Sequence, residues 1–212
     1  PSTTDVSKMD VSEDPDSARE AILAAAYRAL GEHGYADLTM ERIGEEFDKS
    51  PSLVYHHYDG KDDLLLACLE FMLENYRADT DAGPPADPRE AMETVCDRLS
   101  LVDAPAEAQQ FVRALVELRG QAPHNEAYRD YFTRSDRFFE AQIATIIQTG
   151  VEQGVFRAVD PERTARMIHT VLSGAFFRYA TSVDDAWLAD IREELRAYNE
   201  RTLYLQDGDE EP

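Results

Sequence analysis

Apolar positions recur at helical spacing over nearly the whole chain. In residues 16–33, for example, Ile22, Ala26, Ala29 and Leu30 stand at i, i+4, i+7 and i+8, on one face of a helix. Glycine and proline fall at intervals that suit helix ends, and alternating β-branched runs are few. The pattern predicts an all-α fold of about nine helices.

Two short helices are predicted after the first one. Gly34 is placed to end the first helix in the left-handed conformation, and Thr39 to cap a short helix with Ile43 and Phe47 on one face. After a turn at 48–49 and a cap at Ser50, a helix is expected over 51–57.

The helix over 51–57 has two different faces. Val54 points inward and Tyr58 follows it four residues later, whereas the outward side chains are Ser52, Leu53, Tyr55, His56 and His57. A helix of two turns is not stable alone in water. We therefore expect it to be braced from behind, with its outer face open to a partner.

The rest of the chain predicts longer helices. They are expected over 61–80, 89–102, 106–121, 125–153, 161–181 and 184–205, with a loop over 81–88. The lead-in over 1–15 and the tail over 206–212 are acidic and are predicted to be disordered.

A helix, a short helix, a turn and a second short helix form a helix-turn-helix arrangement, whose second element enters the DNA major groove. The segment 18–66 resembles the N-terminal domain of the tetracycline-repressor (TetR) family of transcriptional regulators. The resemblance rests on Gly34-Tyr35, LTMERIGEEF, SPSLVYHHY and GKDDLL. It implies a helix-turn-helix domain over 16–60, an effector-binding and dimerisation domain over 61–205, and a homodimeric repressor of a palindromic double-stranded DNA operator, released by a small-molecule effector.

The same resemblance assigns DNA contacts. Phosphate contacts are implied at Thr39, Tyr55 and Lys61, and base contacts at Ser52, Leu53 and His56 with Glu41 or Arg42. Ser50 and His57 are expected to touch the DNA backbone, and Lys49, which stands where the family usually has an aliphatic residue, to add a phosphate contact. Two histidines in sequence are also compatible with ordinary surface or, less readily, with a metal pair, since neighbouring helical positions diverge by about 100°.

The charge of the chain argues against a strongly electrostatic grip on DNA. The sequence has 43 acidic and 21 basic residues, only three of them lysines, and a net charge of −22. From 39 to 61 there are three basic and five acidic residues. We expect a shallow salt dependence of binding, and an origin in a halophile, where molar salt shortens the screening length to about 3 Å.

The middle and last helices predict an effector pocket and a dimer interface. An aromatic-rich set is expected to enclose an apolar or aromatic effector, with intrachain core as the alternative for each member: Phe111, Leu115, Leu118, Tyr128, Phe132, Phe139, Ile143, His169 and Phe176. The expected dimer interface, with the same alternative, consists of Met167, Val171, Gly174, Arg178, Trp187, Ile191, Leu195, Tyr198 and Thr202.

Other function classes receive little support. No Gly-rich phosphate loop, nucleophile elbow or metal triad occurs, so the sequence predicts neither an enzyme nor a cofactor or metal site. Cys68 and Cys96 are expected to be buried, with a redox role as the alternative. No apolar run is long enough for a membrane span, and a cytoplasmic location is expected. The remaining alternative is a TetR-like protein-interaction module without DNA binding.

Overall fold

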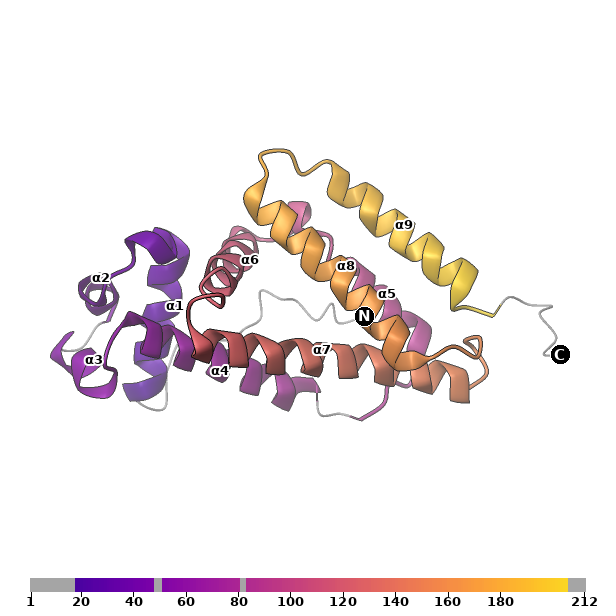
Figure 1. Cartoon of the computed structure of the whole chain (residues 1–212), viewed down its shortest axis with the longest axis horizontal. Helices are drawn as coiled ribbons and strands as arrows, with labels where there is room; N and C mark the ends of the chain where they lie inside the picture. The colour runs from indigo at the N-terminus through magenta and orange to yellow at the C-terminus, as the bar shows by residue number, and fades with distance from the viewer. Residues whose placement is uncertain (1–17, 48–50, 81–82, 206–212) are drawn as a thin grey trace. The chain divides into compact units, whose positions relative to one another are not determined.

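The computed structural model describes residues 18–47, 51–80 and 83–205, and the side chains of 18, 51–53 and 79 are not described. Within these ranges every named element of secondary structure is a helix (Figure 1). The helices are α1 (Ala18–Asp37), α2 (Met40–Glu45), α3 (Pro51–His57), α4 (Lys61–Thr80), α5 (Pro88–Asp97), α6 (Ala106–Arg119), α7 (Glu126–Glu152), α8 (Pro161–Thr181) and α9 (Trp187–Thr202), with a 3-10 turn η1 (Leu101–Asp103).

The chain packs as two compact units. One contains the described residues of 18–80 together with 105–133, and the other contains 83–104 and 134–205. One boundary between the units falls within α7, and the first unit combines segments that are far apart in the sequence. The predicted domain boundary at residue 60 divides the chain differently and stays a prediction.

The first unit contains the expected helix-turn-helix, in which α2 packs against both α1 and α3 (Figure 1). Gly34 has a φ of 69° inside α1 and breaks its helical backbone, as predicted. The Thr39 side chain accepts a hydrogen bond from the Arg42 N–H at 3.3 Å and caps α2. We call residues 18–60 the head.

The core of the head is formed by small and branched apolar side chains. Ile22, Ala26, Ile43 and Val54 are fully buried, and Phe47, Leu30 and Tyr58 are nearly so. The predicted inner faces of the first three helices are therefore confirmed. Alanines on α1 let the neighbouring helices approach closely, because their side chains take little space.

The second unit is closed by its own C-terminal segment. Phe156, after α7, and Tyr204, after α9, form an isolated antiparallel bridge, and their rings stack with centroids 5.2 Å apart. The Arg89 guanidinium donates to the carbonyls of Val155 and Leu205 and lies over the Tyr204 ring. This bridge fixes the end of α9.

Several helix ends differ from the prediction. The helix expected over 89–102 begins at Pro88, because Asp87 caps it, and ends at Asp97. Three successive 3-10 bonds follow, from the N–H groups of residues 98, 99 and 100. The helix expected from 184 begins only at Trp187, since the Asp184 side chain accepts the Ala186 N–H in a turn of its own.

Candidate nucleic-acid interface

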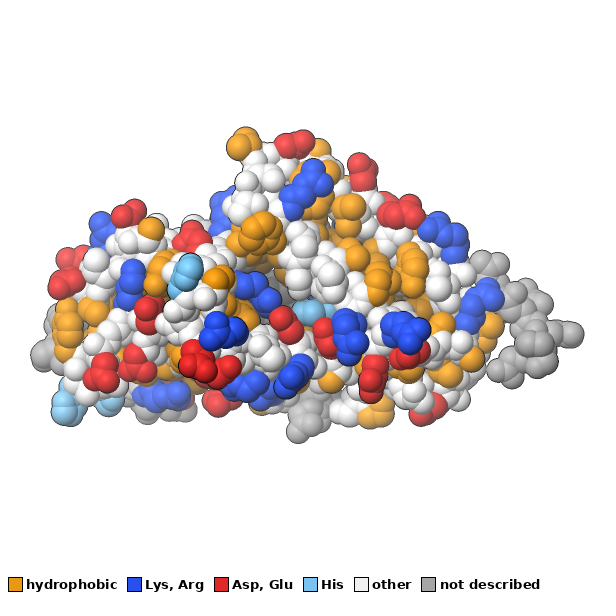
Figure 2. Space-filling view, viewed as in Figure 1, with side chains coloured by type: hydrophobic (Ala, Val, Ile, Leu, Met, Phe, Trp, Pro, Cys, Tyr) orange, Lys and Arg blue, Asp and Glu red, His pale blue; other side chains and the backbone are white. Residues whose placement is uncertain are grey.

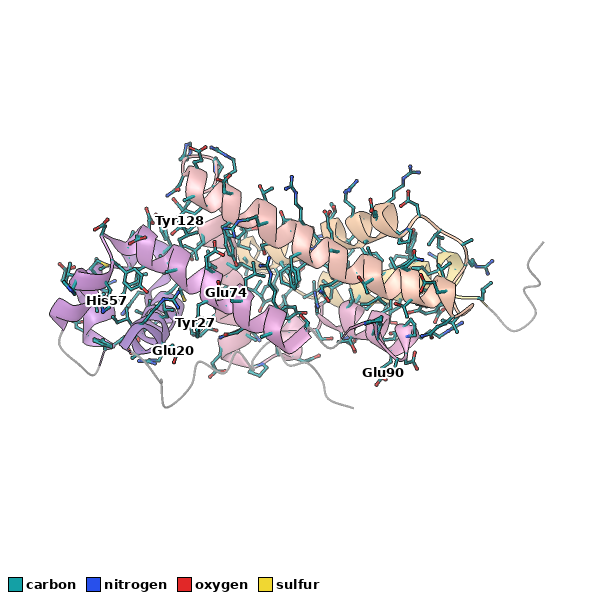
Figure 3. The ribbon with its side chains drawn as sticks, turned by 90° about the horizontal axis from the view of Figure 1, so that it is seen from below. Glu20, Tyr27, His57, Glu74, Glu90 and Tyr128 are labelled. Carbon is teal, nitrogen blue, oxygen red and sulfur yellow. The ribbon has the colours of Figure 1, made fainter. Side chains whose placement is uncertain are left out.

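The two faces of α3 are those predicted. Val54 is fully buried and Tyr58 is 9% exposed, whereas Tyr55 is 52% exposed and His56 and His57 are exposed. His57 is labelled at the end of the helix in Figure 3. The outer face thus carries one phenol and two imidazoles, all capable of hydrogen bonds to phosphates or base edges.

Four other predicted contacts cannot be placed. Lys49 and Ser50 lie outside the described residues. Ser52 and Leu53 belong to α3 by their backbone, but their side chains are not described. Their roles stay predictions.

The predicted contacts on α2 are tied to one another. Glu41 is exposed. Its carboxylate accepts hydrogen bonds from its own N–H, from the Thr39 hydroxyl and from the Tyr55 hydroxyl. These three bonds lower the pKa of Glu41, and the bond from its own N–H has the largest effect. The pKa of Tyr55 is raised, first by desolvation and then by the Glu41 charge. The Arg42 guanidinium donates to the Asp37 carbonyl and is held by its own chain.

Lys61 is also held within the protein. Its ammonium donates to the carbonyls of Tyr35 at 2.9 Å and Leu38 at 3.3 Å, and lies 4.2 Å from the centroid of the Tyr35 ring. An ammonium has three donors, so one N–H remains for a phosphate. The predicted phosphate contact stays a prediction, and the two carbonyl bonds are an additional structural role.

Three of the predicted pocket residues line one cavity of the first unit. Phe111, Leu115 and Leu118 on α6 face Tyr27 of α1 and Cys68 of α4 around an apolar space of about 10 Å³. That volume suits about one water molecule rather than an effector. Tyr128 and Phe132 are buried in the same unit without lining this cavity.

The other predicted pocket residues lie in the second unit. The His169 ring stacks on Phe139, with centroids 6.2 Å apart, and its Nε2 lies 3.2 Å from Asp136 Oδ1 and 3.4 Å from Ser173 Oγ. Ile143 is buried and Phe176 half-buried. The effector site itself stays a prediction.

Most of the predicted dimer residues remain partly accessible in the single chain. Met167, Val171, Trp187, Ile191, Tyr198 and Thr202 are half-buried, and Gly174 and Arg178 are exposed. Figure 2 shows apolar side chains over α8 and α9. Leu195 is the exception: it is 5% exposed and belongs with Leu188 and Asn199 to the inner face of α9, which fits the alternative of intrachain core, and its assignment to the interface stays a prediction.

Comparison with known proteins decides the family. Residues 22–68 match the model of bacterial regulatory proteins of the tetR family, and residues 86–204 match the C-terminal model of BetI-type transcriptional repressors. The chain belongs to the TetR family of transcriptional regulators.

Individual TetR relatives cover most of this chain. The transcriptional regulator BetI of Brucella anthropi is 27% identical over 171 residues, 78% of this chain and 83% of its own. The structure of a TetR regulator from Haloarcula marismortui is 38% identical with a TM-score of 0.76, covering 87% of this chain and 97% of its own. A putative regulator from Saccharomonospora viridis, solved in complex with choline, shares the fold at 22% identity and a TM-score of 0.72, over 89% of this chain and 98% of its own.

The TetR assignment makes the protein a ligand-responsive, DNA-binding transcriptional regulator and not an enzyme. In the described part of the chain, no three His, Cys, Asp or Glu side chains are arranged to hold a metal ion. A search of the same residues found no helix with the length and apolar character that a membrane crossing needs.

Three residues that join the TetR head to other helices by hydrogen bonds were not predicted as contacts from the sequence. Tyr35 and Asp62 were seen only as parts of family motifs, and Glu117 was not singled out. Their partners lie on other helices, so no local spacing reveals them. An exposed-looking Tyr directly after a helix-ending Gly was the one available signal.

Proposed function

We propose that the protein binds a palindromic duplex operator as a homodimer, with α3 entering the major groove of each half-site. The observation that carries this proposal is that Val54 on α3 and Tyr58 directly after it are buried, whereas Tyr55, His56 and His57 on α3 are exposed. A short helix fixed from behind, with hydrogen-bonding rings outward, suits the docking of a recognition helix.

A two-fold dimer through α8 and α9 supplies the second half-site. On each of these two helices, the half-buried residues form a face beside the buried one, and this face is available to a partner subunit. A Cβ added to Gly174 would meet no atom within 4 Å, so a partner helix can approach closely there. Two recognition helices related by a two-fold axis read half-sites about 34–36 Å apart.

Affinity in this proposal comes from hydrogen bonds, apolar contact and DNA shape more than from charge. Five acidic residues against three basic ones over 39–61 leave little cationic neutralisation of phosphates. The salt dependence of operator binding is therefore shallow, with a slope on a logarithmic scale well below that of a basic repressor.

The first effector class is apolar or aromatic. It is supported by the aromatic side chains on α6, α7 and α8, several of which are only half-buried in the structure, such as Phe111, Phe138, Phe139 and Phe176. An effector of this class shifts the population toward a conformer with the two heads out of register.

A second effector class, an organic cation, is favoured by one observation. The Arg98 guanidinium carbon lies 5.7 Å from the centroid of the Phe139 ring, so this ring already accepts a cation, and the Asp136 carboxylate lies close by on His169. The Saccharomonospora viridis protein was solved in complex with choline. Choline and its neutral carbon isostere distinguish the classes: a rise of the melting temperature with choline alone favours the cation, and a rise with both favours the apolar class.

Selection from a random duplex library in molar potassium chloride tests the proposed function. A recovered motif with two-fold symmetry supports a dimeric regulator that reads a palindrome. Enrichment of an asymmetric motif contradicts the palindrome, and no enrichment at all favours the alternative of an interaction module.

A cytoplasm rich in potassium chloride is proposed as the setting, from the acid excess, the scarcity of lysine and the likeness to the Haloarcula marismortui regulator. Screening at molar salt weakens repulsion among the acidic side chains. Melting across a potassium chloride series tests it: stability rises strongly toward molar salt, and equal stability at low and molar salt contradicts it.

A further inference from the structure

One carboxylate oxygen joins three helices at the start of α4. The Tyr35 hydroxyl, from the end of α1, donates to Asp62 Oδ1 at 2.9 Å, and the Tyr128 hydroxyl, from the start of α7, donates to the same oxygen at 3.3 Å. Tyr128, which is labelled in Figure 3, is 1% exposed. A phenol in such a place needs a partner, because an unpaired buried hydroxyl is costly.

The backbone beside Tyr35 is held from two further helices. The Glu117 carboxylate, on α6, accepts the Tyr35 N–H next to the left-handed Gly34, and the Lys61 ammonium, on α4, donates to the Tyr35 carbonyl. The link between α1 and α2 is therefore fixed at its N–H, its carbonyl and its side chain.

The hydrogen bonds between Glu117 and the Tyr35 N–H and between Tyr128 and Asp62 both come from one corner of the fold, and we call them the two corner bonds. Glu117 lies near the end of α6 and Tyr128 near the start of α7, on either side of the turn over 120–125. Asn125 Oδ1 accepts the N–H groups of Ala127 and Tyr128 and caps α7, which ties the backbone of Tyr128 to the turn. A displacement of this corner therefore changes both corner bonds together.

Asp62, the acceptor of the Tyr128 bond, is close to the DNA-reading helix along the chain. Asp62 is the second residue of α4, and Tyr58, four residues earlier, is buried at the end of α3. A hydrogen bond to a charged carboxylate is stronger than one between two neutral groups. Bonds of this strength at the start of α4 are sufficient to change the relative populations of two orientations of α3 by a large factor.

We propose that Glu117 and Tyr128 are positioning residues for DNA binding: through Tyr35 and Asp62, the α6–α7 corner holds the head at the angle that reads DNA. The inference rests on the proposed DNA-binding function. It assigns the link between the α6–α7 corner and the head to two hydrogen bonds of this chain.

The test compares Tyr128→Phe with Tyr204→Phe. Tyr204 is a matched control, since its buried hydroxyl also donates to a carboxylate, Glu93 Oε1 at 3.1 Å, but in the unit without the head. The first readout is the affinity for the selected duplex. Tyr128→Phe weakens it roughly tenfold, and Tyr204→Phe leaves it unchanged.

The second readout needs no DNA. A spin label at Glu32→Cys, an exposed position on α1, reports the distance between the two heads of the dimer. Tyr128→Phe broadens this distance distribution with little change in melting temperature, whereas Tyr204→Phe does not. In the background of Asp62→Asn, adding Tyr128→Phe has a much smaller effect, because the shared acceptor is already altered.

Glu117→Gln provides an independent variant if Tyr128→Phe does not fold. It replaces the anionic acceptor of the Tyr35 N–H with a neutral one, and broadens the distances less. Unchanged distances in both variants, or equal changes in Tyr204→Phe, overturn the inference. A wild-type protein that binds no duplex overturns the proposed function instead, and the distance readout still decides the role of the corner.

Discussion

The Tyr55 hydroxyl on α3 donates a hydrogen bond to the Glu41 carboxylate on α2. Thr39 donates to the same carboxylate, so two of the side chains expected to meet phosphates are arranged around a negative charge. The arrangement orders their hydroxyls, and it also places an anion where the phosphates are expected.

Replacing Glu41 with Gln keeps an acceptor for both hydroxyls but removes the charge. We predict that Glu41→Gln strengthens duplex binding about two- to fivefold at low salt, and that the gain disappears in molar potassium chloride, where screening acts within about 3 Å. Titration of a labelled duplex by fluorescence anisotropy measures this effect.

The control for Glu41→Gln is Glu74→Gln. Glu74 is exposed on α4 and the variant has the same net charge, but the residue lies outside the head. An equal gain in both variants would show that only the total charge matters and that Glu41 has no special place.

Tyr35 predicts a loss of stability in alkali. Partial burial, followed by the hydrogen bond to Asp62 and its charge, raises the pKa of Tyr35 from 10 to about 12. The folded state favours the neutral phenol, so this contribution is complete below pH 10 and is lost as the pH rises toward 12. We expect the unfolding free energy of Tyr35→Phe to fall less between pH 9 and pH 11, as measured by urea denaturation; parallel curves for variant and wild type would argue against this.

Both cysteines are predicted to be unreactive in the folded protein. Burial raises the pKa of the Cys68 and Cys96 thiols to about 12, and their exposures are 4% and 0%. Alkylation followed by mass spectrometry is expected to modify neither thiol until the protein unfolds, because the thiolate is the reactive form. Rapid modification of either one in the native state would restore the redox alternative.

Gly150 and Gly174 predict opposite responses to alanine. A Cβ on Gly150 would lie 2.2 Å from the Phe156 ring, whereas one on Gly174 meets no atom within 4 Å. We predict that Gly150→Ala lowers the unfolding free energy by about 3 kcal/mol and breaks the bridge to Tyr204. Gly174→Ala raises the stability of the single chain by about 0.5–1 kcal/mol.

Dimerisation confounds a simple melting experiment on the second variant, so both are measured at several protein concentrations. If Gly174 lies at the dimer interface, the gain from Gly174→Ala shrinks or reverses under dimeric conditions. Similar stabilities for Gly150→Ala and the wild type would show that Phe156 can move aside.

Local signals determined which parts of the fold were predictable. The bounds of α3 and α4 were predicted residue for residue, because Pro51 and Gly60 punctuate the chain there and the buried Val54 and Tyr58 set the phase. The start of α9 at Trp187 was not predicted, because the helical pattern of the sequence continues upstream to residue 184. A local turn at Asp184 interrupts the helix there.

Long-range pairings left no trace in the sequence pattern. The bridge between Phe156 and Tyr204 joins two segments without strand character, and the acceptor role of Asp62 depends on tyrosines from two other helices. A charged residue in the first turn of a helix has a sufficient local explanation in the helix dipole, which conceals its tertiary contacts.

The central claim is that the outward side chains of α3 read base edges twice, through a symmetric dimer. The most direct test measures the affinity of wild type and His56→Ala for every single base-pair substitution of the selected duplex. The account predicts that His56→Ala loses about 1–3 kcal/mol of discrimination at one position, and at its symmetry mate in the other half-site. Uniform weakening at all positions, or an unchanged profile, would contradict it.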